Sequence, residues 1–261
     1  MGAVSLYAKP SATFAQKLEA SKALLISAAA EFTPITQASS LGAEDMVVSH
    51  LIVETGITSS IFVLDTRMLH TQTLALVGRL EDRYGVKVDI YQPDPATAAT
   101  FVLENGDGAM YKSLKLRKAC CDFRKREPLE RALAGKKAWI TGLRREQSNA
   151  RAEVHAIEPG AERAKINPLA DWTQGDIWHF ISINNVPYNP LHDEFFPSIG
   201  CAPCTRSVTL GEDFRSGRWW WEQESAKECG LHVDSNAAGA EPPAFESISR
   251  ISNIPIKEIA A

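Results

Sequence analysis

Apolar residues recur along most of the chain with two alternating periods. Helical spacing runs over residues 11–31, behind Ser11, which we predict as a helix N-cap. Short apolar or β-branched segments predict strands at residues 35–40, 60–65, 86–91 and 137–141. Helices are predicted between them at residues 46–53, 71–84 and 95–104. This alternation predicts an α/β fold, a mostly parallel twisted sheet with helices on both faces.

The pattern changes after the fourth predicted strand. Residues 151–166 are polar and irregular, and we predict a surface loop there. A capped amphipathic helix follows from Thr173 through Ile183, with Trp172, Ile177, Trp178 and Phe180 expected in the core. Residues 186–197 form an extended, proline-punctuated approach to Cys201, and residues 235–250 have the composition of a flexible tail.

Polar residues follow three of the predicted strands where the strands end. Ser40 begins the stretch Ser40-Leu-Gly42-Ala-Glu-Asp45, Asp65 follows the second strand, and Gly142 follows the fourth. A strand, a turn of small residues and a helix start direct backbone N–H groups toward an anion, although this stretch alone also fits an ordinary connection. Because ligands bind at the carboxyl ends of parallel strands, we predict that Ser40, Asp65 and Gly142 converge on one crevice.

Composition and charge narrow the class of protein. The 261 residues are 44% hydrophobic and 23% charged, as is ordinary for a soluble globular protein. No apolar run approaches the roughly 20 residues that span a bilayer, and residues 1–10 lack the features of a secretory signal, so we predict a cytoplasmic protein with no membrane partner. The net charge of −4 does not support nucleic-acid binding. Arginines and lysines near the cysteines and glycine turns favour an anionic small molecule, although each alone also fits a solvated surface charge.

Four of the five cysteines form two close pairs, Cys120-Cys121 and Cys201-x-x-Cys204. Cytosolic cysteines stay reduced, which argues against a disulfide framework. Vicinal side chains on a helix diverge by about 100°, which is awkward for one tetrahedral zinc but suits a cubane, where each thiolate can bind its own iron. We therefore predict a [4Fe–4S] cluster on Cys120, Cys121, Cys201 and Cys204, with structural zinc and ordinary buried thiols as alternatives.

The fifth cysteine, Cys229, lies in a different context. It follows Glu228 and precedes Gly230, outside any apolar periodic segment of the kind that holds a structural cysteine. His232 is close enough in sequence to lower its pKa, and the thiolate is the reactive form. We predict that Cys229 is a nucleophile; a tail cysteine with no role is the alternative.

Ordered motifs over residues 35–233 match one family of enzymes. They are Ser40-x-Gly42-x-Glu44-Asp45, Leu64-Asp65-Thr66 with Leu69-His70, Cys120-Cys121 with Arg124-Lys125, Thr141-Gly142 with Arg145-x-Gln147-Ser148, Asn167-Pro-Leu with Trp172, Cys201-x-x-Cys204 and Glu228-Cys-Gly-Leu-His232. With these motifs the chain resembles the assimilatory sulfonucleotide reductases, specifically the bacterial, thioredoxin-dependent adenosine 5'-phosphosulfate (APS) reductases.

The resemblance implies a fold, a reaction and partners. The fold is like that of the PP-loop ATP pyrophosphatases and adenine nucleotide alpha hydrolases, with the nucleotide at the strand ends and a C-terminal extension that carries the nucleophile. Cys229 attacks the sulfur of APS, AMP departs, and thioredoxin or glutaredoxin releases sulfite from an S-sulfocysteine. The cluster is non-redox, and its cysteines imply APS rather than the 3'-phosphorylated PAPS. The family also suggests a homotetramer or dimer.

The resemblance, together with the charge that develops during the reaction, implies roles for individual residues. The AMP phosphate gains negative charge as the S–O bond breaks, so preorganised cations stabilise it. Lys125 is expected between the cluster and the sulfate or phosphate, with His232 as a further catalytic residue. The substrate contacts that the family implies are Ser40, Gly42, Asp65, Thr66, Gly142, Arg145, Arg215 and Arg218.

The chain departs from the family pattern in two places. Arg67 and Met68 replace the usual Gly-Arg pair, and Asp122 adds a carboxylate directly after Cys121. We therefore assign no substrate contact to Arg67.

Three other functions remain open at this point. One is a PAPS reductase that carries a cluster, and another is a nucleotide sensor without turnover, which would have no use for Cys229. The third is an ATP-dependent PP-loop enzyme, which typically needs a stricter Ser-Gly-Gly-x-Asp-Ser loop. For the leading interpretation the predicted parts are an N-terminal helical segment (1–34), a nucleotide-binding domain (35–199), the cysteine and arginine segment (200–233) and a tail (234–261).

Overall fold

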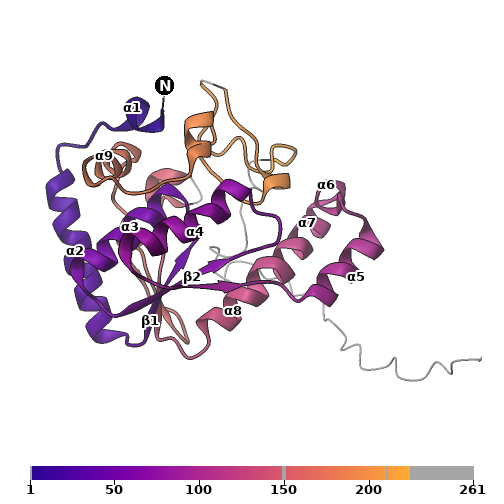
Figure 1. Ribbon diagram of the computed structural model, residues 1–261, viewed down its shortest axis with the longest axis horizontal. Helices are drawn as coiled ribbons and strands as arrows, with labels where there is room; N and C mark the ends of the chain where they lie inside the picture. Colours follow the sequence, from indigo (N-terminus) through magenta and orange to yellow (C-terminus); the bar gives the residue numbers. More distant parts are fainter. Residues whose placement is uncertain (1, 149–150, 210, 224–261) are drawn as a thin grey trace, which may run out of the picture.

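A six-stranded sheet forms the centre of the part of the chain that the structure, a computed structural model, describes: residues 2–148, 151–209 and 211–223 (Figure 1). The strands are β1 (Ile35–Ser39), β2 (Ser59–Leu64), β3 (Val88–Tyr91), β4 (Ala138–Ile140), β5 (Ile157–Glu158) and β6 (Ala164–Ile166). Their order is β3-β2-β1-β4-β6-β5, and every neighbouring pair is parallel except β5 with β6. The predicted α/β fold with a mostly parallel sheet is confirmed.

Helices cover both faces of the sheet because its strands are apolar on both sides. The α-helices are α1 (Ala3–Tyr7), α2 (Phe14–Glu31), α3 (Ala43–Thr55), α4 (Thr71–Tyr84), α5 (Pro95–Asn105), α6 (Ala109–Lys112), α7 (Leu114–Cys121), α8 (Glu127–Leu133) and α9 (Gln174–Asn184). In β2, Ile61 and Val63 join the core beneath α3 and α4, whereas Phe62 points to the opposite face and packs with Leu129 and Leu133 of α8 (Figure 1). None of the helices within the described ranges is long and apolar enough to cross a bilayer.

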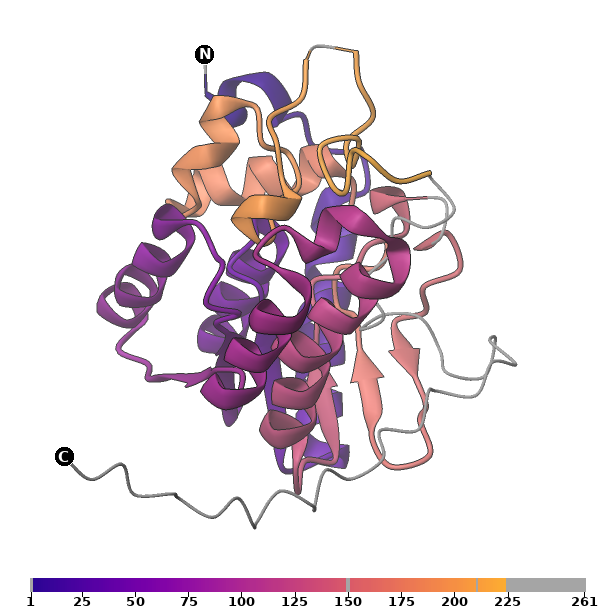
Figure 2. The ribbon, with the colours of Figure 1, turned by 90° about the vertical axis from the view of Figure 1, so that its right-hand side faces the viewer.

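The end of the described chain lies beside helices α6 and α7, of which α7 carries the first cysteine pair. Figure 2 shows this orange segment next to the magenta helices α6 and α7. Tyr111 of α6 packs edge-on against Trp221 at 4.5 Å, and its hydroxyl donates to the carbonyl of Pro203. Segments far apart in sequence therefore meet at one end of the sheet.

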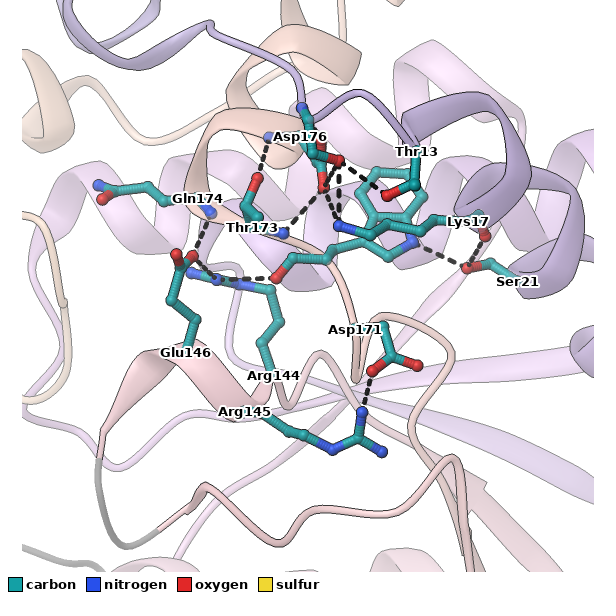
Figure 3. Close-up of polar contacts among 12 residues, drawn as sticks. Thr13, Lys17, Ser21, Arg144, Arg145, Glu146, Asp171, Thr173, Gln174 and Asp176 are labelled. Carbon is teal, nitrogen blue, oxygen red and sulfur yellow. Dashed lines mark hydrogen bonds and ion pairs between the residues drawn. The ribbon is translucent and has the colours of Figure 1, made fainter.

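The N-terminal segment is tied to the start of α9 by one carboxylate (Figure 3). Asp176 accepts hydrogen bonds from the backbone N–H groups of Ser11 (2.7 Å) and Thr173 (2.9 Å) and pairs with Lys17 at 2.9 Å. Burial alone would raise the pKa of Asp176, but these donors outweigh it and hold the pKa at about 2. Ser11 is therefore not the predicted N-cap: α2 begins at Phe14 after Thr13, because Ser11 bonds to Asp176 instead.

The largest correction concerns residues 151–166, predicted as a polar surface loop. They contain β5 and β6, and β6 lies in the sheet beside β4, with Ala164 and Ile166 buried. Helices α6, α7 and α8 were not predicted either. The core positions Trp172, Ile177, Trp178 and Phe180 are confirmed. The predicted tail, residues 234–261, and the predicted division into parts past residue 223 lie outside the described residues.

Candidate active site

One buried carboxylate joins the carboxyl ends of β1 and β4. The Oδ2 atom of Asp45 accepts from the N–H (2.7 Å) and hydroxyl (2.5 Å) of Ser40, and Oδ1 accepts from the N–H of Gly142 at 2.9 Å. Strand order reverses between these two strands, because β2 and β3 lie on one side of β1 and β4 lies on the other. Such a switch point is where open α/β sheets bind ligands. The predicted convergence of Ser40 and Gly142 is thus present.

The backbone at this junction leaves little space and carries strain. A Cβ atom at position 142 would lie 2.6 Å from Oδ1 of Asp45, so only glycine fits there. Leu41, fully buried between Ser40 and Gly42, has a φ of 61°, a left-handed conformation that is unfavourable for a branched side chain. Strained backbone of this kind is concentrated at functional sites in proteins.

A cavity of about 210 Å³ opens at these strand ends. Ser40, Gly42, Thr66 and Gly142 line it with small or hydroxyl-bearing residues. Lys125, Arg215 and Arg218 line it too, and both arginines are more than 90% buried. Buried cations around a cavity are an arrangement for an anionic ligand, because their charges are little screened by water.

Arg144 fixes the helix start that carries Asp45. Its guanidinium donates to Glu44 through Nε (3.0 Å) and Nη2 (2.8 Å) and to the carbonyl of Trp172 at 3.2 Å. Burial acts to raise the pKa of Glu44, but the charge and hydrogen bonds of Arg144 hold it below its usual value. The neighbouring Arg145 pairs with Asp171 and donates to the carbonyl of Val154 at 2.7 Å (Figure 3). Adjacent arginines therefore serve different parts of the structure.

The two cysteine pairs share one pocket close to this cavity. Cys120, Cys201 and Cys204 are buried in a single cluster with Met110 and Trp219, and Cys121 packs against it. The loop after β2 reaches the second pair, since Ala202 donates its N–H to the carbonyl of Met68 (2.7 Å) and the Thr66 hydroxyl lies 3.2 Å from Sγ of Cys201. Burial and the neighbouring Cys201 raise the pKa of the Cys204 thiol to about 12.

The residues around the four thiols suit a group that carries negative charge. Arg117, Arg124 and Lys125 line the thiol pocket together with apolar side chains. Nε of Arg124 and Nε1 of Trp219 are buried donors with no hydrogen-bond partner in the part of the chain that the structure describes. Buried donors of this kind are normally satisfied, so a bound acceptor between the thiols would complete them. Within the described ranges, no three Cys, His, Asp or Glu side chains converge closely enough to hold a single metal ion.

Lys125 connects the thiol pocket with the cavity. It belongs to a single π-helical turn, Asp122–Arg126, that follows Cys121 directly. Turns of this type interrupt helices at functional sites and re-aim the side chains that follow. Lys125 lines both the cavity and the thiol pocket, and its charge opposes the raised pKa values of Cys120 and Cys204. Its predicted position between a cluster and the sulfate or phosphate stays a prediction, for which this place between the two spaces is the structural basis.

The comparison with known families decides the assignment of this fold and site. The phosphoadenosine phosphosulfate reductase domain matches residues 34–207. The chain belongs to the phosphoadenosine phosphosulfate reductase family. The resemblance noted in the sequence is thereby confirmed.

Within this family the chain is similar to bacterial proteins over most of its length. It is 48% identical over 221 residues to an adenosine 5'-phosphosulfate reductase of Burkholderia cepacia, covering 84% of this chain and 88% of that protein. It is 50% identical over 229 residues to an adenosine 5'-phosphosulfate reductase of Allochromatium vinosum, covering 87% and 89%.

Solved structures agree with this assignment. A phosphoadenylyl-sulfate (PAPS) reductase from Candida auris aligns with a TM-score of 0.62 and 27% identity, over 72% of this chain and 90% of that one. An FMN adenylyltransferase from Candida glabrata aligns with a TM-score of 0.54 at 15% identity, over 90% and 86%, a likeness of fold alone. The predicted PP-loop type of fold is thus confirmed by its structural neighbours.

Most residues that the family resemblance assigns to substrate binding line the cavity: Ser40, Gly42, Thr66, Gly142, Arg215 and Arg218. Asp65 and Arg145 do not line it. Asp65 accepts from the N–H of Arg67 and from Gln92, both at 2.9 Å, and so shapes the loop that carries Thr66. Cys229 and His232 lie outside the described residues.

An arginine and a histidine of the cavity were not predicted from the sequence. Arg151, from the same loop as Arg145, lines the cavity, as does His192. Arg151 lies just past the end of the matched Arg145-x-Gln147-Ser148 motif, and its membership of the arginine-rich loop was the available signal. His192 stands in the proline-punctuated approach to Cys201, where no periodicity marks it as buried.

The departure from the family pattern at position 67 has a visible backbone consequence. Arg67 has a φ of 60°, the left-handed conformation that glycine adopts without cost. The glycine usual at this position therefore suits the geometry, and Arg67 holds the same turn with the help of Asp65, which accepts from its N–H. Arg67 is not among the residues that line the cavity.

Asp45 makes the stability of this junction depend on pH. Burial raises the pKa of Asp45 to about 6, despite the hydrogen bonds from Ser40 and Gly142. The folded state then holds a proton that the unfolded state releases, so this contribution to stability is lost as pH rises. We expect the free energy of unfolding of wild type, relative to Asp45→Asn, to fall by about 1.4 kcal/mol between pH 5 and 7.5, measured by urea denaturation. A difference that stays constant over this range would show that the hydrogen bonds outweigh burial.

Proposed function

We propose that this protein reduces adenosine 5'-phosphosulfate to sulfite and AMP in assimilatory sulfate reduction, with thioredoxin or glutaredoxin as the reductant. The observation that carries the proposal is the anion cavity of Lys125, Arg215 and Arg218 at the switch point of the sheet. Similarity to APS reductases at 48 to 50% identity over most of the chain supports the substrate.

The reaction balances with one nucleophile and an external dithiol. The Cys229 thiolate forms a bond to the sulfate sulfur of APS, and the bond from that sulfur to the phosphate oxygen of AMP breaks. AMP leaves with the electron pair, and the sulfonate remains on Cys229. A reductant thiolate then attacks Sγ of Cys229 and expels sulfite, and the second reductant thiol resolves the mixed disulfide. The dithiol supplies both electrons, so sulfur passes from sulfate to sulfite oxidation state.

The residues of the cavity supply charge and position for this step. Lys125, Arg215 and Arg218 stabilise the negative charge that develops on the departing phosphate, because they already surround the cavity before the reaction begins. Arg215 and Arg218 are buried, and Lys125 is half-buried. Ser40, Gly42 and Gly142 offer backbone and hydroxyl hydrogen bonds to the nucleotide. His232 is proposed to orient the Cys229 thiolate or to contact the sulfate, as the family motif implies.

A [4Fe–4S] cluster is proposed on Cys120, Cys121, Cys201 and Cys204. The four thiols share one pocket, and the adjacent side chains of Cys120 and Cys121 diverge on helix α7, which suits separate iron atoms better than a single zinc. The unsatisfied donors of Arg124 and Trp219 fit the sulfur atoms of such a group. When bound, the cluster would supply fixed charge next to Lys125 rather than electrons.

Reduction of PAPS is the second candidate, because the Candida auris structure with this fold is a PAPS reductase. The higher sequence identity to APS reductases, 48 to 50% against 27% to the Candida auris PAPS reductase, favours APS. Cytoplasmic location and a homo-oligomeric state, a tetramer or dimer, are part of the same proposal.

The test is one turnover without reductant. Anaerobically purified protein is mixed with sulfur-labelled APS or PAPS, followed by intact-mass analysis and by assays of iron and acid-labile sulfide. We expect a sulfonate adduct that forms at least ten-fold faster with APS, on protein that contains iron and sulfide in equal amounts. Equal rates with both nucleotides would remove the preference for APS. Iron-loaded protein that forms no adduct with either nucleotide would overturn the proposed chemistry, and zinc in place of iron would overturn the cluster.

A further inference from the structure

A buried ion pair joins the cysteine helix to the last described residues of the chain. Arg117 of α7 donates to Glu222 through Nε (2.9 Å to Oε1) and Nη2 (2.7 Å to Oε2), a bidentate pair. Only 1% of the Arg117 side chain and 7% of the Glu222 side chain is exposed. A bidentate arginine–carboxylate pair fixes direction as well as distance.

Arg117 also belongs to the thiol pocket. Its guanidinium lies 4.8 Å from the ring centre of Trp219, and it lines the pocket together with Cys121. Hydrogen bonding and charge interaction with Cys121 act on the pKa of Arg117 in the same direction as Glu222 does. Arg117 thus stands between a cysteine of the pocket and the carboxylate of Glu222.

Glu222 is close in sequence to the proposed nucleophile, which suggests a role for the pair. Glu222 lies seven residues before Cys229, and the described chain ends at Gln223. Two charges this well buried are expensive to desolvate, and well-packed apolar residues can replace such pairs without loss of stability. A role in fixing a unique arrangement accounts for the pair better than stability does.

We infer that Arg117 and Glu222 are positioning residues for the nucleophile: beside the four-thiol pocket they fix the place and orientation of the backbone at Glu222, from which the sequence continues to Cys229. The inference rests on the proposed function of Cys229. It also couples the two sites, because the side chain that orients this segment contacts the pocket of Cys121.

The size of the rate loss distinguishes an orienting role of the pair from a role as a simple tether. Seven residues from Glu222 reach at most about 25 Å, and ten residues from Trp219, the next buried anchor, reach about 36 Å. The effective concentration of the Cys229 thiolate at the cavity falls roughly as the −3/2 power of the tether length. If loss of the Glu222 anchor only lengthened the tether from seven to ten residues, the attack would slow by about two-fold. Misplacement of a reacting group by about 1 Å can slow a reaction by about a hundred-fold. An effect well above two-fold therefore indicates orientation.

The experiment compares the full-length, iron-loaded wild type with the variants Glu222→Gln and Arg117→Lys. Two quantities are measured for each protein: the rate of single-turnover adduct formation on Cys229 with APS, and the affinity for AMP. The matched control is Glu212→Gln, which breaks the exposed bidentate pair of Glu212 with Arg206 in the same part of the chain. We expect the adduct rate to fall at least ten-fold in Glu222→Gln, and less in Arg117→Lys, with AMP affinity and iron content within two-fold of wild type. We also expect AMP to protect Cys229 from iodoacetamide less well in Glu222→Gln than in wild type.

Other outcomes overturn the inference in distinguishable ways. A change of two-fold or less in Glu222→Gln, or an equal change in Glu212→Gln, would show that the pair does not orient the nucleophile. Parallel loss of iron and of AMP affinity would show that the pair only maintains the fold of the pocket. If wild type itself forms no adduct on Cys229, the proposed function fails and this inference fails with it.

Discussion

Replacing Cys229 by serine is expected to lower the rate of sulfite formation from APS by at least about a thousand-fold, because the reaction then lacks its thiolate nucleophile. A serine hydroxyl is scarcely ionised at neutral pH and is a far weaker nucleophile toward sulfur. The measurement is sulfite release with a dithiol reductant, combined with intact-mass detection of the adduct.

The variant should leave the rest of the site intact. The four cysteines of the thiol pocket are unchanged, so iron content and AMP affinity are expected within two-fold of wild type. Ser225→Ala, four residues earlier in the same segment, is the matched control and should keep both adduct and turnover. A Cys229→Ser protein that retained more than about a tenth of the wild-type rate would exclude Cys229 as the attacking group.

Local patterns were sufficient to predict the sheet where each strand buries both of its faces. In β2 the alternation of Ile61, Phe62 and Val63 divides the strand between two cores, and α4 has the predicted bounds. The same reasoning failed for β6, which has only three residues with Lys165 at its centre. So short a strand carries no periodicity, and its burial comes from pairing with β4.

Those residues of the site that lie just past the ends of parallel strands could be predicted from the sequence. Ser40 and Gly142 meet because parallel strands end at one edge, and Asp45 then bridges them. The choice between adjacent arginines was not predictable. Arg144 and Arg145 are alike in sequence, yet only Arg144 of the two is buried, because it faces Glu44, whereas Arg145 pairs with the exposed Asp171.

The meeting of the two cysteine pairs depends on long-range contacts that no local pattern reveals. The second pair is held by the loop after β2, through the bond from Ala202 to Met68, and the first pair is presented by α7. From the spacing of the two cysteine pairs, the sequence predicted that the four thiols bind one common group. Their common pocket, and the ion pair of Arg117 with Glu222 at its side, follow only from the tertiary structure.

Lys125→Ala is expected to lower kcat/KM for APS by about a hundred- to a thousand-fold, or roughly 3 to 4 kcal/mol of transition-state stabilisation. Lys125 is the cation that lines both the cavity and the thiol pocket, so its removal withdraws charge from the departing phosphate at the point where the two sites meet. Steady-state sulfite release measures the loss, and iron analysis shows whether the thiol pocket survives.

Two further variants separate charge from general damage to the helix. Arg126→Ala removes the next cation on the same π-helical turn, an exposed arginine 3.7 Å from Asp122, and should change kcat/KM by less than about three-fold. Lys125→Arg keeps the charge but not the shape, and should recover part of the loss. If Lys125→Ala were no worse than Arg126→Ala, the charge of Lys125 would not act on the reaction. If Lys125→Ala instead lost its iron, the lysine would serve the thiol pocket rather than the departing phosphate, and the cations left to stabilise AMP would be Arg215 and Arg218.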